Sequence, residues 1–225
     1  MKNIYCASVF SDHCVLQRNK PIRIWGTADT DTLVQVSLNG RSVTYPVTDH
    51  DWFVELPAME AGGPYTLEIS NNGKICQCFK DVMIGEVWLA GGQSNMEYPL
   101  AQDGDGKSAM EQALHTNVRF FQVPRLSFKD DYYYRTEQEN HWALPTDEEL
   151  PDWSAVGYYF AADLAQKLGV TIGIIGCNLG GTSACAWQDK EALLSHKDTR
   201  IYCDEYEELL KHRTRKNMKE SVQTI

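Results

Sequence analysis

The residues best suited to chemistry surround Ser94, which follows an apolar run and two glycines. Residues 87–90 read as a buried strand, and Gly91-Gly92 ends it. Ser94 therefore offers a hydroxyl at the carboxyl end of a strand, where open α/β sheets place their reactive groups. A hydroxyl there can serve as a nucleophile for acyl transfer, or Ser94 or Asn95 can cap a following helix. The turn alone leaves both roles open. It is not the Gly-x-Ser-x-Gly elbow, because Met96 replaces the second glycine.

A second glycine turn, Gly180-Gly181, follows another buried strand. Residues 170–177 are β-branched and apolar, and a helical pattern beginning at Trp153 and Ser154 and ended by Gly169 precedes them. Strand–helix–strand alternation favours a parallel sheet with crossover helices. We therefore expect the turns at Ser94 and at Gly180-Gly181 to lie at the same edge of that sheet.

The elements that must position these turns form two predicted domains. Residues 8–80 contain short alternating strands with turn signals, of which Asn39-Gly40 is the clearest hairpin turn. This pattern predicts an antiparallel β-sandwich domain over residues 1–83. The pattern changes at Gly85, so residues 84–225 form the second, α/β domain. In the first domain, the aromatic residues Trp25, Trp52 and Tyr65 could line a sugar-binding face, but packing in the core or between domains is the favoured interpretation.

The remaining segments are polar. Residues 102–107 read as a solvated loop, and residues 108–115 as a short helix capped by Ser108. Residues 125–150 form a long connection whose three tyrosines at 132–134 either face a sugar or cover the core. The charged segment 198–225 predicts a partly exposed helix that requires a partner.

Composition limits the classes of partner. A net charge of -10 over 225 residues argues against nucleic acid. We find no membrane-spanning stretch and only a poor signal peptide, so we expect no membrane partner and a cytoplasmic location. The seven cysteines are an odd, scattered set and predict reduced thiols. Cys76 and Cys78 are interpreted as buried structural thiols.

The segment Gly92-Gln-Ser-Asn-Met96 resembles the first block of the SGNH/GDSL hydrolases, in the form carried by sialate O-acetylesterases. Further segments resemble the same family in the same order; they are residues 11–18, 24–26, 62–65, 81–88, 154–160 and 180–182. The resemblance covers residues 8 to 195. It implies a three-layer α/β/α domain with a parallel sheet, and an esterase that removes acetyl groups from sugars, with sialic acid as the expected sugar.

The resemblance also implies the site residues. Ser94 would be the nucleophile, and the backbone N–H groups of Ser94 and Gly181, together with Asn178, would form the oxyanion hole. Gln93 and Asn95 would contact the substrate. We expect no cofactor and no metal, because no His/Asp/Glu cluster has ligand spacing. Two alternatives stay open: an acetylxylan esterase, and a catalytically inactive carbohydrate-binding fragment.

The base that should activate Ser94 is missing. The family carries its acid and base in an Asp-x-x-His block near the end of a longer chain, and no such block occurs here. None of the six histidines has the matching context; they are His13, His50, His115, His141, His196 and His212. We therefore expect an incomplete hydrolase sheet of about three parallel strands. We also expect an exposed apolar flank that favours self-association or cover by another chain, and weak activity or none.

Overall fold

The computed structural model of the protein describes residues 3–125 and 131–211. The chain divides into two compact units, Met1–Gly180 and Gly181–Ile225. The strands of the first unit are β1 Ile4–Cys6, β2 Val15–Gln17, β3 Ile22–Ala28, β4 Thr32–Leu38, β5 Arg41–Val47, β6 Asp51–Leu56, β7 Gly62–Asn71, β8 Lys74–Gly92, β9 Val118–Gln122, β10 Trp142–Ala143 and β11 Ile172–Asn178. Its helices are α1 Ser94–Glu97, η1 Leu100–Gln102, α2 Gly106–Ala113, α3 Asp131–Glu139, η2 Leu150–Asp152 and α4 Ala155–Leu168.

The N-terminal strands form two groups that share a core. Strands β1, β3 and β6 pair in one sheet, while β5, β4, β7 and β8 pair in order in another, and all of these pairings are antiparallel. Side chains alternate between buried and exposed along β4 and β6, as expected for half-buried strands. The predicted hairpin at Asn39-Gly40 is confirmed, with φ angles of 48° and 73°.

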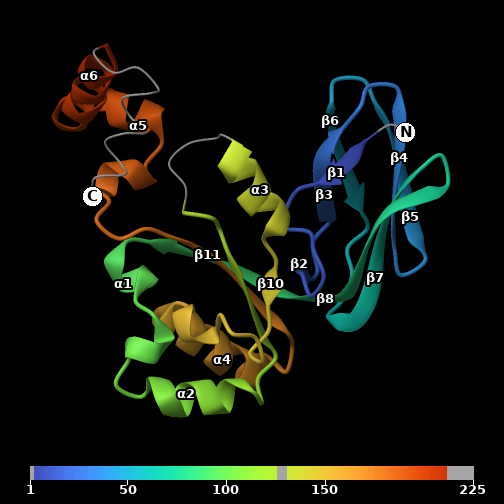
Figure 1. Ribbon diagram of the computed structural model, residues 1–225, viewed down its shortest axis with the longest axis horizontal. Coiled ribbons are helices and arrows are strands. Elements are labelled where there is room, and N and C mark those ends of the chain that lie inside the picture. Colours follow the sequence, from blue (N-terminus) through green and yellow to red (C-terminus); the bar gives the residue numbers. More distant parts are fainter. Residues whose placement is uncertain (1–2, 126–130, 212–225) are drawn as a thin grey trace. The chain divides into compact units, whose positions relative to one another are not determined.

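Strand β8 continues from this antiparallel sheet into a parallel one. It pairs with β11, which pairs with β9, and both pairings are parallel. The short β10 adds an antiparallel edge to β9. Figure 1 shows β8 running from the antiparallel strands beside β7 to the parallel strands beside β11. The chain is thus a mixed α/β structure, and the division that the sequence predicts after residue 83 falls inside one 19-residue strand.

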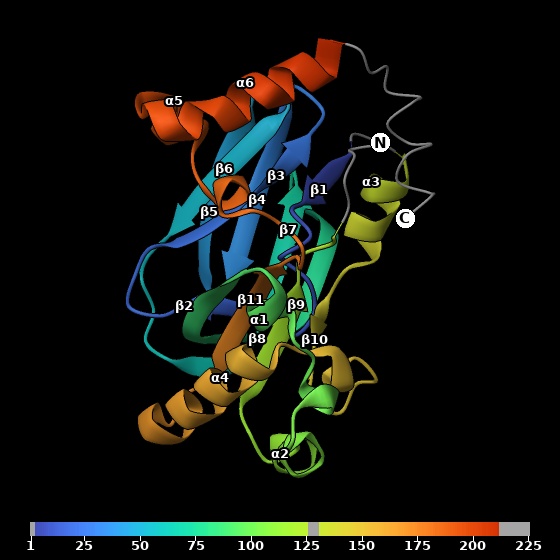
Figure 2. The ribbon, with the colours of Figure 1, turned by 90° about the vertical axis from the view of Figure 1, so that its left-hand side faces the viewer.

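Helices α2 and α4 lie on one side of the parallel strands, as Figures 1 and 2 both show. Ser154 caps α4, since its Oγ accepts from the Gly157 N–H at 3.1 Å, and Gly169 ends it in the left-handed region with φ 63°. The predicted start and end of this helix are confirmed. The predicted cap of α2 is wrong: the helix begins at Gly106, and the Ser108 Oγ instead accepts from the Gln112 side chain.

The last residues of β8 have an exposed apolar flank. β2 pairs with β8 only as far as Gly85, and no other described strand of the first unit pairs with residues 88–92 on that side. Trp88 is 45% exposed and Leu89 68%. Trp88 meets Phe160 of α4 edge to face at 5.1 Å. The sequence predicts such a flank, and what covers it stays a prediction.

Other sequence expectations have mixed outcomes. Trp52 is a core residue at 1% exposure, whereas Trp25 is 44% exposed. The interpretation of Cys76 and Cys78 as buried thiols is wrong, because both lie in exposed positions at the start of β8. The long connection 125–150 contains α3 and β10. Of its three tyrosines, Tyr132 is exposed, and the side chains of residues 133 and 134 lie outside the described set.

The second unit consists of η3 Ala184–Trp187, α5 Lys190–Ser195 and α6 Lys197–Lys211. Asp189 caps α5 by accepting from the N–H groups of Glu191 and Ala192. Residues 198–211 of the predicted charged segment 198–225 are helical, and residues 212–225, with His212, lie outside the described residues. Within the described ranges, none of the helices has the length and apolarity that crossing a membrane requires.

Candidate functional site

Ser94 lies just beyond the carboxyl end of β8, as the first residue of α1. The Gln93 carbonyl accepts from the N–H groups of Met96 and Glu97, both at 2.9 Å, which closes this short turn. Gly92 holds φ 153°, a value that side chains disfavour, and a Cβ on it would come within 3.2 Å of the Met96 Cβ. Gln93, not Ser94 or Asn95, occupies the N-cap position, and no side chain caps the helix. The capping interpretation of Ser94 is therefore wrong, and its exposed side chain is not committed to holding the turn.

The end of β11 lies beside this turn. Cys177 pairs with Gly91 and Asn178 with Gly92, and the Leu179 N–H donates to the Gly92 carbonyl at 3.1 Å. A Cβ placed on Gly180 would lie 3.5 Å from the Ser94 Oγ. The two glycine turns thus leave the sheet at the same edge, as parallel pairing requires.

Glu97 connects the two turns. One of its carboxylate oxygens accepts from the Gly180 N–H, and the other forms an ion pair with the Arg125 Nη1 at 3.1 Å. The same carboxylate occupies the space next to Gly180 so tightly that a Cβ there would approach it to 2.6 Å. Residue 180 must therefore be glycine for this contact to exist.

Arg125 fixes the orientation of Asn178. Its Nε donates to the Asn178 carbonyl at 3.0 Å, and its Nη2 donates to the Asn178 Oδ1 at 2.6 Å. An arginine can only donate, so the side-chain atom that faces it must be the amide oxygen. The Asn178 Nδ2 then points elsewhere, is buried, and has no acceptor among the described residues. A buried donor without an acceptor costs about 1–3 kcal/mol.

No histidine of the described first unit is bonded to Ser94. The His13 Nδ1 lies 2.7 Å from the Asp81 Oδ2 and the His50 Nδ1 lies 3.3 Å from the Ala28 carbonyl. The His141 Nε2 lies 3.4 Å from Glu149. His115 ends the turn after α2, and His196 belongs to the second unit. The His13–Asp81 pair has the chemistry of a base and its orienting acid, but it lies at the opposite end of the parallel strands.

Arg119 also contacts Asp81 there. Burial raises the pKa of this carboxyl, but hydrogen bonds from His13 and Arg119, together with the charge of Arg119, outweigh burial and lower the pKa below its usual value.

Among residues 3–125 and 131–211, one group of side chains could hold a metal ion. His141, Asp147 and Glu149 place ligand atoms within 4.8 Å of one another. Asp147 already accepts from the Leu144 N–H at 2.6 Å, and His141 is exposed. This group lies around β10 and not at the Ser94 turn, and the geometry assigns it no role there.

The structure thus places Ser94 and Asn178, two of the residues expected from the sequence, at the same edge of the parallel sheet. Gln93 and Asn95 are exposed beside Ser94, and their substrate contacts stay a prediction. Gly181 begins the second unit with φ 76°, and its oxyanion role also stays a prediction. Sequence reasoning missed Glu97 and Arg125. For Glu97, the short spacing of three residues from Ser94 is the sequence signal that could have found it. Arg125 follows the end of β9 by three residues, in a segment that offers no such signal.

The chain is similar to known carbohydrate esterases in sequence and in fold. The family described as carbohydrate esterase, sialic acid-specific acetylesterase, matches residues 84–225. The sialate O-acetylesterase of Mus musculus is 28% identical over 204 residues, and that of Homo sapiens is 30% identical over 207; each match covers 83% of this chain. The chain spans only 38% and 39% of those relatives. A crystal structure of a carbohydrate acetylesterase from Xanthomonas citri superposes with a TM-score of 0.76 at 36% identity, covering 88% of this chain and 45% of that one.

Proposed function

Since the chain belongs to the carbohydrate esterase family of sialic acid-specific acetylesterases, we propose that it carries the nucleophile and oxyanion half of an acetylesterase site. Ser94 is the nucleophile, and the substrate is an O-acetylated sugar. The observation that supports this most is the exposed Ser94 hydroxyl at the sheet edge where β11 ends with the buried Asn178, whose Nδ2 has no acceptor among the described residues.

The proposed reaction is a two-step acyl transfer. The Ser94 Oγ adds to the acetyl carbonyl while its proton passes to a base, and the carbonyl oxygen becomes an oxyanion. The tetrahedral intermediate expels the sugar alcohol, which takes up that proton, and leaves an acetyl-serine. Water then adds to this ester, releases acetate and returns the proton to Ser94.

Asn178 is the best candidate to stabilise the oxyanion. An oxyanion forms only in the reaction, so a donor that lacks an acceptor beforehand gains a hydrogen bond in the transition state. Arg125 positions this donor by holding the amide oxygen. The Gly180 N–H is already bonded to Glu97, so it is not the donor in this arrangement. The Ser94 N–H lies in the first turn of α1, where backbone donors have no acceptor within the helix.

The proposal leaves the base for Ser94 unassigned. The described histidines of the first unit form their contacts elsewhere, so exogenous imidazole should act as a surrogate base. We therefore propose to measure the hydrolysis of a chromogenic acetate by the chain with increasing imidazole. Expected is slow hydrolysis that rises with imidazole and is lost in Ser94→Ala. Ser108→Ala is the matched control, because Ser108 is an exposed serine of α2.

Two outcomes would change this proposal. Hydrolysis that is equal in the wild-type chain and in Ser94→Ala at every imidazole concentration would contradict Ser94 as the nucleophile. Turnover typical of a complete esterase, without imidazole but dependent on Ser94, would show that one of the chain's own histidines is the base. Comparing release of acetate from acetylated sialic acid and from acetylated xylan then separates the two candidate substrates.

A further inference from the structure

The three-stranded sheet presents aromatic side chains on the face that points away from the core. Trp25 of β3 is paired with Phe53 of β6, and Tyr5 of β1 is paired with Thr27 of β3. Directly paired residues share a face, and so do residues two apart in a strand, so these four side chains lie on one face. Tyr5 is 52% exposed, Trp25 44% and Phe53 45%. Three large exposed aromatic side chains on one small sheet are unusual for a surface without a ligand.

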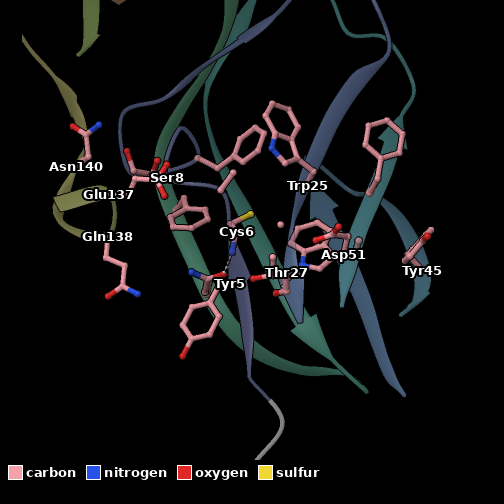
Figure 3. A pocket seen from close by; sticks show the side chains of 18 residues that line it. Tyr5, Cys6, Ser8, Trp25, Thr27, Tyr45, Asp51, Glu137, Gln138 and Asn140 are labelled. Carbon is pink, nitrogen blue, oxygen red and sulfur yellow. Dashed lines mark hydrogen bonds between the residues drawn. The ribbon is translucent and has the colours of Figure 1, made fainter. Parts of the chain in front are cut away.

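These side chains belong to a cleft of about 780 Å³, within the range of ligand-binding pockets. Figure 3 shows Tyr5, Trp25, Thr27 and Asp51 around it, with Glu137 and other residues near the end of α3 on another side. Phe10 contacts Trp25 edge to face, with ring centres 4.6 Å apart at 81°. Because Phe10 is buried, this contact fixes the position of the Trp25 ring, while part of Trp25 stays accessible.

The polar groups of the cleft match a neutral, hydroxyl-rich ligand. The Gln77 Oε1 accepts from the Cys6 N–H at 2.9 Å, which holds the amide and leaves its NH₂ as a donor. The Thr27 hydroxyl and the Asp51 carboxylate have no hydrogen-bond partner among the described residues. Sugar hydroxyls both donate and accept, so they can use an amide, a hydroxyl and a carboxylate together.

The charge of the cleft favours a neutral ligand over an anionic one. None of the 18 described residues that line it is lysine, arginine or histidine, whereas Asp51 and Glu137 are acidic. The Asp51 carboxylate, with no cationic side chain among those lining residues, repels a negatively charged sugar such as sialic acid. Exposed aromatic rings, in contrast, pack against the C–H faces of neutral pyranose rings.

We propose that this cleft is a second carbohydrate-binding site, which holds neutral sugar units of an oligosaccharide or polysaccharide. Its aromatic face is formed by β1, β3 and β6, and Gln77 and Phe79 come from the first part of β8, whereas Ser94 follows the other end of that strand. No residue that lines the cleft belongs to the Ser94 turn. The site would retain the neutral part of a long glycan while a reaction takes place elsewhere. The inference extends the proposed function but does not require Ser94 to react.

The test measures binding without turnover. The full chain carrying Ser94→Ala is titrated with xylohexaose as the neutral probe and with sialyllactose as the anionic probe, by tryptophan fluorescence and calorimetry. Expected is binding of xylohexaose in preference to sialyllactose. Adding Trp25→Ala or Phe53→Ala should weaken xylohexaose binding about tenfold, the loss of one aromatic contact. Ile75→Ala is the matched control, since Ile75 is 53% exposed in β8 and does not line the cleft.

Asp51→Asn keeps every ring and removes one charge at an exposed position, so it tests the charge argument. This variant should bind sialyllactose and xylohexaose with more similar affinities than the parent chain does. Equal binding by the Trp25→Ala, Phe53→Ala and Ile75→Ala proteins, or absence of xylohexaose binding, would overturn the proposal. So would self-association of the chain that Trp25→Ala abolishes, because the face would then be an interface between copies. None of these outcomes depends on hydrolysis, which the imidazole experiment measures separately.

Discussion

The two ends of the parallel sheet each contain an arginine that joins neighbouring segments, but only one leaves a polar group unsatisfied. At the amino end, Arg119 donates to the His13 and Asp81 carbonyls and to the Asp81 carboxylate, and its side chain is only 11% exposed. At the carboxyl end, Arg125 is 36% exposed, and by holding the Asn178 Oδ1 it leaves the Nδ2 without an acceptor among the described residues. At the amino end, the contacts of Arg119 leave no buried side-chain donor of its partners unsatisfied. At the carboxyl end, the Asn178 Nδ2 requires an additional acceptor, which the oxygen of a reacting group can provide.

The comparison also explains why a His–Asp pair alone does not identify an active site. His13 and Asp81 are close and well paired, yet they lie where the parallel strands begin. Ser94 lies where they end. A proton cannot pass directly between groups at opposite ends of a sheet, so the pair is structural.

The largest expected effect is at the amino end. Arg119→Ala removes three donors from a mostly buried position, and we expect it to lower the free energy of unfolding by about 3 kcal/mol. Urea denaturation followed by tryptophan fluorescence measures this loss. The control is Arg23→Ala, which breaks an exposed ion pair with Glu55 and should change stability by less than about 1 kcal/mol. Equal losses in the two variants would contradict a structural role for Arg119.

Arg125→Ala should affect hydrolysis more than stability, in contrast to Arg119→Ala. The side chain is more exposed, so we expect a loss of about 1–2 kcal/mol. The imidazole-supported hydrolysis should fall more than about tenfold, because Asn178 is then free to rotate away from its oriented position. Arg125→Lys keeps the charge but not the fork of donors, and should recover stability better than activity. If the loss of activity were no larger than the loss of folded protein, Arg125 would have no positioning role.

The sequence predicted the parts of this fold that depend on local pattern. The turn at Asn39-Gly40, the cap at Ser154 and the ending at Gly169 all follow from the backbone preferences of single residues, and the structure confirms them. The proximity of the two glycine turns follows from parallel pairing alone. Contacts such as Arg125 with Asn178 join residues 53 positions apart. No local pattern contains that information, and the same holds for the cleft at Trp25.

Acidification should weaken the amino end selectively. The pKa of Asp81 is lower in the folded chain than the usual unfolded value of about 3.9. The carboxylate therefore contributes its full stabilisation of the fold above the unfolded pKa. This stabilisation is lost as the pH falls towards the folded pKa. The carboxylate is 34% exposed, so solvent screening limits the effect to less than about 1 kcal/mol. The difference in the free energy of unfolding between the wild-type chain and Asp81→Asn should therefore shrink as the pH falls from about 5 to about 3, a range that spans about one unit on either side of the ordinary Asp pKa. A difference in stability that stays constant over this pH range would show that Asp81 does not have the lowered pKa.

The smallest expected effect on stability tests how Glu97 holds the Gly180 turn. Glu97→Gln retains one acceptor oxygen, which can accept from Gly180 or from Arg125 but not satisfy both as a carboxylate does. We expect a stability loss below about 1 kcal/mol and a shift of the Gly180 amide resonance in an NMR spectrum. If that shift accompanies an unchanged rate of imidazole-supported hydrolysis, the Gly180 N–H is not an oxyanion donor, and Asn178 carries that role. If the rate instead rises when the Gly180 N–H is released, Glu97 restrains a donor that the reaction can use. The carboxylate paired with Arg125 would then affect the reaction, whereas Asp81, which is paired with Arg119, would be structural.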